Sequence, residues 1–237
     1  MKSCTEHTKT SDCAIHPGQG GFCSQLSESA LRDLRSYMVS VIYPEDATLF
    51  EEQEPLRGVF VLTSGLVKLS VGSAEGKNLI LRLVRPGSVL GLSASISGHA
   101  YGNQATAVHR CEAGFIRSDD FSRFLAAHPE AYEAICRELV SQQGDALEQL
   151  RIVTLSGSVP ERLAKLLLDW SETGQATKEG IRVKMPLTHE EIGEFIGTTR
   201  ETVSRTLGQF KNRRLVALHG ATLMISNRAG LERMGMA

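Results

Sequence analysis

The sequence has no run of about 18 consecutive apolar residues, so we expect no membrane-spanning helix. Its first residues, MKSCTEHTKTSDC, lack the apolar core of a secretion signal, and we therefore expect a cytoplasmic protein. Proteins of that compartment rarely hold structural disulfides. The five cysteines are accordingly expected to be thiols or metal ligands.

The sequence also lacks the motifs of common enzyme classes. We find no P-loop, no Gly-x-Ser-x-Gly and no His-Glu-x-x-His, and no two cysteines have Cys-x-x-Cys spacing. We therefore expect no enzyme. A thiol redox enzyme that uses Cys13 or Cys23 is kept as an alternative hypothesis.

Charge of one sign is not in excess over the whole chain, but it is unevenly distributed. Residues 159–237 carry 12 Lys and Arg against 9 Asp and Glu, whereas the preceding residues carry 14 against 18. This difference is expected if only the C-terminal part contacts phosphate groups. A non-specific architectural DNA-binding protein, a second alternative, would require a far more basic chain.

The apolar pattern predicts an α+β fold with distinct parts. Residues 1–24 form a cysteine-containing lead-in segment, and Leu26, Leu31, Leu34 and Met38 have the spacing of a short helix within 25–40. From 41 to 118, short apolar runs separated by glycines predict an N-terminal antiparallel β-roll. We expect this sensor domain to span 25–127.

A long helix is predicted within residues 128–157. Its apolar positions recur every three or four residues, as in a coiled coil, and we expect the helix to pair with its copy in a homodimer. An alternative is that the stripe only covers the roll. The predicted dimer contacts are Ile135, Leu139, Gln142, Ala146, Leu150 and Val153.

Residues 158–237 predict a winged helix-turn-helix domain. Thr188-His-Glu-Glu191 has the pattern of a capping box that opens a first helix, and Gly197 suits a left-handed turn. Thr198-Thr-Arg-Glu201 is interpreted as a second capping box. The buried faces are expected to be Ile192, Phe195 and Ile196 on the first helix and Val203, Leu207 and Phe210 on the second.

The second helix would present polar side chains near its N-terminus, where a recognition helix meets base edges. Arginine can donate to guanine, glutamate can accept from the cytosine amino group, and serine can bond a base or a phosphate. Phosphate contacts are expected from threonines at the helix starts, from Lys211 and from His219 in the turn of the wing. The full predicted set is Thr188, Thr198, Thr199, Arg200, Glu201, Ser204, Arg205, Lys211 and His219.

The segments TRETVSRTL and LVALHGATLMI resemble the DNA-binding region of the CRP/FNR superfamily of bacterial regulators, and VFVLTSG and LRLVRPGSVLGLS resemble its sensor strands. The resemblance implies a homodimer that binds double-stranded DNA and contacts RNA polymerase, as an activator or as a repressor. It makes Glu201 and Arg205 the base-reading pair, with Ser204 completing the pattern of the FNR branch. It also implies a two-fold symmetric target with TTGA-type half-sites about one helical turn apart.

The effector of the roll is left open. In the resembling family a Gly-Glu and an Arg-Ser pair hold cyclic nucleotide, but here Gly91 precedes Leu92 and no Lys or Arg occurs from Leu92 to His109. The sequence therefore argues against cAMP, because a phosphate in an apolar roll needs a cationic partner. Haem held by His99 and His109, another small ligand, or no ligand are further alternatives.

An iron–sulfur cluster of the FNR type is the other hypothesis for the sensor. The candidate ligands are Cys4, Cys13, His16, Cys23 and Cys111. His16 stands where the middle cysteine would be expected, and such clusters normally use four thiolates, although histidine can replace cysteine. Otherwise Cys111 and Cys136 are interpreted as small core residues.

Overall fold

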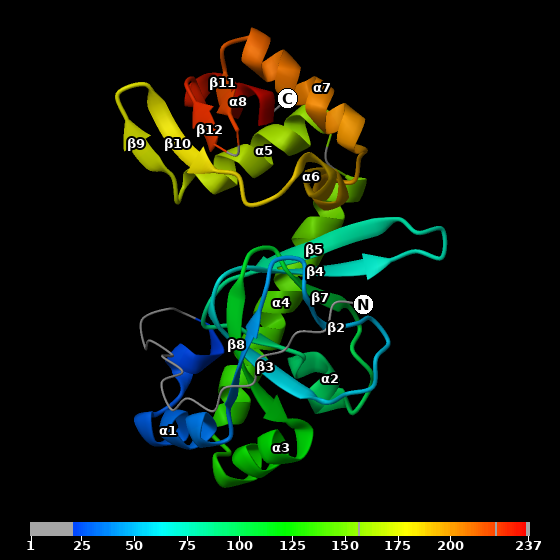
Figure 1. Ribbon diagram of the computed structural model, residues 1–237, viewed down its shortest axis with the longest axis vertical. Coiled ribbons are helices and arrows are strands. Elements are labelled where there is room, and N and C mark those ends of the chain that lie inside the picture. Colours follow the sequence, from blue (N-terminus) through cyan, green and yellow to red (C-terminus); the bar gives the residue numbers. More distant parts are fainter. Residues whose placement is uncertain (1–20, 156, 221, 236–237) are drawn as a thin grey trace. The chain divides into compact units, whose positions relative to one another are not determined.

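The strands of the first part of the chain form two antiparallel four-stranded sheets, with the orders β1-β8-β3-β6 and β2-β7-β4-β5. The computed structural model describes residues 21–155, 157–220 and 222–235. The strands are β1 Val39–Tyr43, β2 Thr48–Phe50, β3 Gly58–Ser64, β4 Val67–Gly72, β5 Asn78–Val84, β6 Val89–Leu90, β7 Gln104–Ala107 and β8 Cys111–Arg117 (Figure 1). The predicted antiparallel roll is confirmed.

The chain divides into two compact units, residues 1–146 and 147–237, and each is described by itself. The helices that begin in the first unit are η1 Phe22–Gln25, α1 Glu28–Ser36, α2 Leu92–Ser97, α3 Ser118–Ala127 and α4 Ala131–Thr154. The division falls inside α4 and therefore inside the predicted dimerisation segment. Among the described helices, none is both long and apolar enough to cross a membrane.

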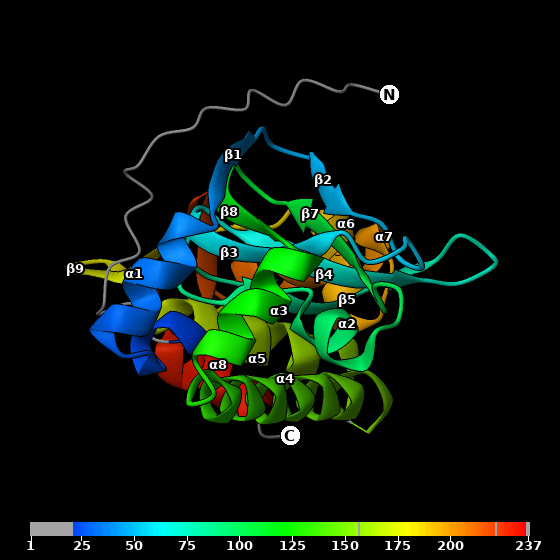
Figure 2. The ribbon, with the colours of Figure 1, turned by 90° about the horizontal axis from the view of Figure 1, so that it is seen from below.

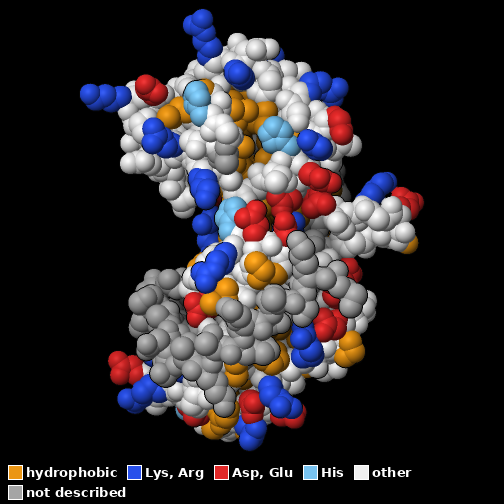
Figure 3. Space-filling model, viewed as in Figure 1, with side chains coloured by type: hydrophobic (Ala, Val, Ile, Leu, Met, Phe, Trp, Pro, Cys, Tyr) orange, Lys and Arg blue, Asp and Glu red, His pale blue; other side chains and the backbone are white. Residues whose placement is uncertain are grey.

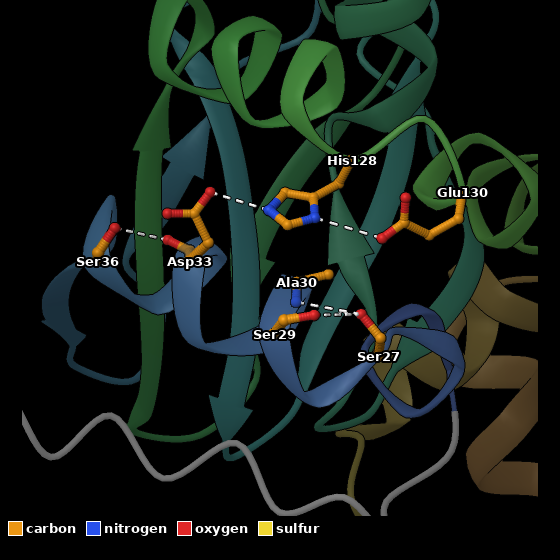
Figure 4. Close-up of polar contacts among 7 residues, drawn as sticks. All are labelled: Ser27, Ser29, Ala30, Asp33, Ser36, His128 and Glu130. Atoms are coloured by element: carbon orange, nitrogen blue, oxygen red, sulfur yellow. Dashed lines mark hydrogen bonds and ion pairs between the residues drawn. The ribbon is translucent and has the colours of Figure 1, made fainter.

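Side-chain polar contacts fix the position of α1. The hydroxyl of Ser27 caps the helix by accepting from the amide of Ala30 at 3.2 Å. His128, which follows α3, lies between two carboxylates: its Nε2 is 3.0 Å from Asp33 Oδ2 on α1, and its Nδ1 is 3.3 Å from Glu130 Oε1 (Figure 4). These contacts join α1 to the turn that leads into α4.

Two buried clusters make the core of the first unit. One contains Leu34 of α1, Val59 of β3, Phe121 of α3 and Ile135 of α4, so these helices pack on the sheet that contains β3 (Figure 2). The other lies inside the roll and includes Phe50, Phe60 and Tyr101. Burial of such large side chains is the main stabilising contribution to a unit of this size.

The position of Ile135 corrects part of the predicted dimer contact. Its side chain is 1% exposed and belongs to the core of its own unit, and Leu139 packs against the same cluster. The N-terminal half of the predicted stripe therefore covers the roll, as the alternative interpretation held. The exposed large apolar residues of α4 are Leu150, which was among the predicted contacts, and Tyr132, Val140 and Leu147, which were not.

The second unit combines helices with one small sheet of order β11-β12-β10-β9. Its elements are α5 Val159–Ser171, β9 Gln175–Thr177, β10 Gly180–Lys184, α6 His189–Ile196, α7 Arg200–Asn212, β11 Val216–His219, β12 Thr222–Ile225 and α8 Arg228–Gly235. The β11–β12 hairpin follows α7 directly and is the predicted wing. The predicted helix-turn-helix with a following hairpin is confirmed.

Candidate nucleic-acid interface

The first helix of the motif begins at the predicted cap. The Thr188 hydroxyl accepts from the Glu191 amide at 3.3 Å, and Glu191 Oε2 accepts from the Thr188 amide at 2.8 Å. This reciprocal capping box confirms the prediction for α6. Ile192 and Ile196 are fully buried, as expected, whereas Phe195 is half-buried and its carbonyl accepts from the Gln149 side chain.

Two glycines shape the turn between α6 and α7. Gly197 has φ 67° and ψ 51°, the left-handed conformation that was predicted for it. A Cβ at Gly193 would lie 2.8 Å from the carbonyl oxygen of Thr198, so only glycine allows the turn to approach α6 this closely. The turn therefore holds α7 at a defined position against α6.

The second helix begins one residue later than predicted. Thr199, not Thr198, is the N-cap: its extended backbone precedes Arg200, and its hydroxyl accepts from the Thr202 amide at 3.3 Å. Thr198 instead belongs to the end of α6, since its amide donates to the Gly193 carbonyl at 2.9 Å. The sequence contains two adjacent threonines, and the backbone conformation selects the second.

The two faces of α7 divide as the sequence predicts. Val203, Leu207 and Phe210 are at most 1% exposed and pack inside the unit. The polar positions that were predicted to read bases are all exposed, namely Arg200, Glu201, Ser204 and Arg205. They are free to meet a ligand without any rearrangement of the core.

The charge state of Glu201 suits a hydrogen-bond acceptor. Hydrogen bonding to its own backbone amide, and then to the Thr199 hydroxyl, lowers the pKa of this carboxyl below its ordinary value. Glu201 is therefore ionised at neutral pH, and a carboxylate can accept from the amino group of cytosine. Guanidinium groups at Arg200 and Arg205 stand on the same stretch of helix.

Further basic side chains follow α7. Lys211, Arg213 and Arg214 are exposed at the end of α7, and His219 is exposed at the end of β11, next to Gly220 with φ 61°. On the face drawn in Figure 3, Lys and Arg side chains stand at several points on the surface of the unit formed by 147–237. Such separated cations can contact successive phosphates along a duplex.

The roll contains a small cavity of about 60 Å³ beside the turn that starts α2. Tyr101 occupies this region: its ring stacks on Phe50 with centroids 4.0 Å apart, and its hydroxyl donates to the Gly58 carbonyl at 2.7 Å. The described lining contains no Lys or Arg, and its polar side chains are Ser93, Tyr101, Asn103 and Gln142. These residues do not fit the anionic phosphate of a cyclic nucleotide.

The candidate metal ligands are only partly described. Cys4, Cys13 and His16 lie outside the described residues. Cys23 and Cys111 are buried in separate core clusters, and burial raises the pKa of the Cys111 thiol to about 12. Within the described ranges, no group of three or more His, Cys, Asp or Glu side chains is placed to hold a metal ion.

The two lone cysteines behave differently from each other. Cys111 is a core residue, as one of the interpretations expected, but Cys136 is exposed on α4.

The predicted dimer residues Ala146 and Leu150 are exposed, whereas Gln142 and Val153 are half-buried. Val153 contacts its own unit, because a Cβ at Gly197 would lie 2.8 Å from its Cγ1.

Sequence reasoning missed two features of this chain. One is a hydrogen bond between His189 Nδ1 and Ser204 Oγ at 2.9 Å, which joins α6 to the exposed face of α7. The side chains lie 15 positions apart, and no periodicity in the sequence indicates this pairing. The other is the exposure of Tyr132, Val140 and Leu147 on α4, which the heptad pattern did not include.

Comparison with known proteins agrees with both units. Residues 40–128 match the cyclic nucleotide-binding domain family and residues 161–234 match the Crp-like helix-turn-helix domain family. A CRP-like cAMP-activated global transcriptional regulator of Mycobacterium tuberculosis is 28% identical over 217 residues, which cover 91% of this chain and 96% of the relative. The nitrogen fixation regulation protein FixK of Bradyrhizobium diazoefficiens is 25% identical over 228 residues, 96% of this chain and 94% of the relative.

Solved structures share the fold. The structure of FixK2 from Bradyrhizobium japonicum superposes with a TM-score of 0.73 at 21% identity, covering 84% of this chain and 98% of that one. The c-di-GMP responsive global regulator CLP of Xanthomonas campestris gives a TM-score of 0.74 at 18% identity, covering 84% and 99%. At these identities the likeness establishes the fold and leaves the ligand open.

Proposed function

The chain belongs to the CRP/FNR family of DNA-binding transcription regulators, and from this premise we propose that it acts as a homodimer on a two-fold symmetric promoter site. One observation carries the proposal. The N-terminal half of α7 exposes Arg200, Glu201, Ser204 and Arg205 together, while the opposite face of the same helix is buried. A helix of this kind can enter the major groove without disturbing its support.

Each exposed group has a distinct role in reading a half-site. Arg205 donates to guanine, and the ionised Glu201 accepts from a cytosine amino group. A TTGA-type half-site, which the family resemblance implies, offers such a guanine–cytosine pair. Thr188 and Thr199 at the helix starts and Lys211 at the end of α7 contact phosphates and set the register.

Dimerisation places two recognition helices on one duplex. Tyr132, Val140, Leu147 and Leu150 are exposed apolar side chains on α4, and we name these four residues the dimer stripe. A helix that exposes such a stripe gains stability by packing against a partner, and a second copy offers the same surface. Copies related by a two-fold axis present their recognition helices to half-sites about one helical turn apart.

Control by an effector completes the proposal. A small ligand or redox signal in the first unit would favour one arrangement of the paired helices over another, and thereby raise or lower DNA affinity. The protein acts in the cytoplasm. When it is bound to its promoter site, it contacts RNA polymerase and acts as an activator. The lining of the roll's cavity contains no described Lys or Arg that could hold the phosphate of a cyclic nucleotide.

Fluorescence anisotropy with two duplexes tests the proposal. One duplex carries inverted TTGA half-sites, and the other carries the same bases in scrambled order. We expect tighter binding to the first, with affinity that falls steeply as salt rises. Glu201→Ala and Arg205→Ala should each lose about 1–3 kcal/mol on the specific duplex and much less on the scrambled one.

Lys211→Ala should weaken binding to both duplexes alike, because a phosphate contact carries no sequence information. Lys178→Ala changes an exposed lysine between β9 and β10 and serves as the charge-matched control. Equal weakening of the two duplexes by Arg205→Ala would count against base reading. A strictly monomeric protein on the specific duplex would count against the two-fold site.

A further inference from the structure

The helix-turn-helix motif contains a polar contact that is independent of its caps. His189 is the first residue of α6, and Ser204 stands on the exposed face of α7. Their side chains meet at 2.9 Å between Nδ1 and Oγ. Both residues belong to the same compact unit, so the contact is a property of that unit alone.

The packing of the two helices fixes the geometry of this contact. Ile192 and Ile196 of α6 are fully buried, as is Val203, the neighbour of Ser204 on α7. The close approach at Gly193 leaves no room for a side chain in the turn. Because neither helix can slide freely, His189 and Ser204 are held within hydrogen-bonding distance.

The contact changes what a serine can offer to DNA. A free hydroxyl can donate or accept, so by itself it distinguishes bases poorly. In the interior of a helix it also tends to bond back to the carbonyl four residues earlier. Ser204 is instead engaged by a side chain of the neighbouring helix, which holds the hydroxyl in one orientation.

We propose that His189 is a positioning residue that sets the base preference of Ser204. In neutral histidine one ring nitrogen donates and the other accepts. In the tautomer that this role requires, Nε2, for which the described residues provide no hydrogen-bond partner, carries the ring hydrogen, and Nδ1 accepts the proton of Ser204. The oxygen of Ser204 then has only lone pairs left for DNA, and it selects a base with an exocyclic amino group: adenine or cytosine in the major groove.

This inference rests on the proposed function and deepens it, because it names a determinant of sequence choice at the same surface. It predicts that base selectivity at one position of each half-site depends on a residue outside the recognition helix. Nε2 can in addition donate to a phosphate, but that contact would be indifferent to sequence. A change in base selectivity therefore reports the positioning of Ser204 by His189, whereas a change in overall affinity alone reports a phosphate contact.

Two conservative variants separate the ring nitrogens. Asparagine places an amide atom where Nδ1 of histidine lies and can still accept from Ser204. Glutamine reaches the place of Nε2 and leaves the Nδ1 position without an acceptor. His189→Asn should therefore preserve the contact with Ser204, and His189→Gln should lose it.

The experiment measures binding of the full chain to the specific duplex and to a panel in which each base pair of the half-site is replaced in turn. All measurements are made at pH 8. We expect His189→Ala to reduce discrimination about threefold to tenfold at one base pair, the value of one hydrogen bond. Ser204→Ala should reduce it at the same base pair, and the double variant should lose little more than either single variant.

His189→Asn should restore discrimination at that base pair, and His189→Gln should not. Thermal unfolding of each free variant controls for folding. A uniform loss on all duplexes with an unchanged base profile, or rescue by glutamine and not by asparagine, would overturn the positioning role. If the wild-type chain fails to prefer the specific duplex over the scrambled one, the proposed function fails instead, so the two failures are distinguishable.

Discussion

Tyr43 of β1 and Cys111 of β8 lie directly opposite one another in an antiparallel strand pair. Both side chains are buried, and burial raises the pKa of each to about 12, from ordinary values of 10.0 and 9.0. For Tyr43 the neighbouring Arg57 lowers the pKa and Cys111 raises it, but burial is the larger effect. The pair makes the roll sensitive to alkaline conditions.

The pair predicts how stability depends on pH. Both groups keep their protons in the folded state at pH values where the unfolded chain loses them, so the free energy of unfolding should fall between about pH 9 and pH 12. Cys111→Ala should make this fall shallower. Urea unfolding at a series of pH values measures it, with Cys136→Ala, at an exposed thiol, as the control that keeps the wild-type slope.

Tyr101 supports a second prediction. Its hydroxyl donates to Gly58 O at 2.7 Å and accepts from the Gly58 amide at 3.2 Å. Tyr101→Phe should cost about 1 kcal/mol of stability through the lost hydrogen bonds, and Tyr101→Ala about 3–5 kcal/mol because it leaves a cavity. Tyr37→Phe, at a half-buried tyrosine whose hydroxyl has no hydrogen-bond partner among the described residues, should be close to neutral in denaturant unfolding. Equal effects of the two Tyr→Phe changes would contradict the interpretation.

The substitution of alanine for glycine should have opposite effects on stability at two positions of the helix-turn-helix motif. Gly197→Ala forces a left-handed backbone on alanine, at about 1–2 kcal/mol, and its Cβ would approach Val153 Cγ1 to 2.8 Å. Gly208→Ala, inside α7 with no atom within 4 Å of the new Cβ, should instead stabilise by about 0.5–1 kcal/mol. Thermal unfolding without DNA compares the two. A destabilised Gly208→Ala would show that α7 has a constraint beyond its helical backbone.

The dimer stripe predicts that the effect of a lysine on dimerisation depends on which side of α4 carries it. Leu147→Lys places a charge on the stripe and should shift the protein toward monomer, because an unpaired charge in an apolar interface is costly. Glu148→Lys introduces the same side chain at the next exposed position, about 100° further round the helix, and should leave the dimer intact. Sedimentation equilibrium measures both. Dissociation by both variants, or by neither, would place the contact elsewhere.

Local patterns predicted the motifs of the second unit well. The capping box at Thr188, the left-handed Gly197 and the buried face of α7 depend on residues close together in sequence, where spacing determines geometry. The start of α7 was placed one residue too early. Thr198 and Thr199 both have a capping side chain, and only the conformation of the preceding turn decides between them.

The dimer contact was predicted less well for a different reason. Apolar residues lie on more than one side of α4: one set contains Ile135 and Leu139, and another contains Tyr132, Val140 and Leu147. Periodicity shows that a helix has an apolar face and does not say which neighbour covers it. The roll decides which side of α4 is covered, because it buries Ile135 and leaves Val140 69% exposed.

By itself the sequence determined the order of the elements, the helix-turn-helix with its wing, and the absence of cationic side chains from Leu92 to His109 that a bound phosphate would need. These depend on neighbouring residues and their chemistry. Only the tertiary structure decided that Tyr101 stacks on Phe50 inside the roll, that Cys23 and Cys111 lie in separate clusters, and that His189 meets Ser204. Each depends on residues distant in the chain, and the packing of whole elements decides whether such residues come together.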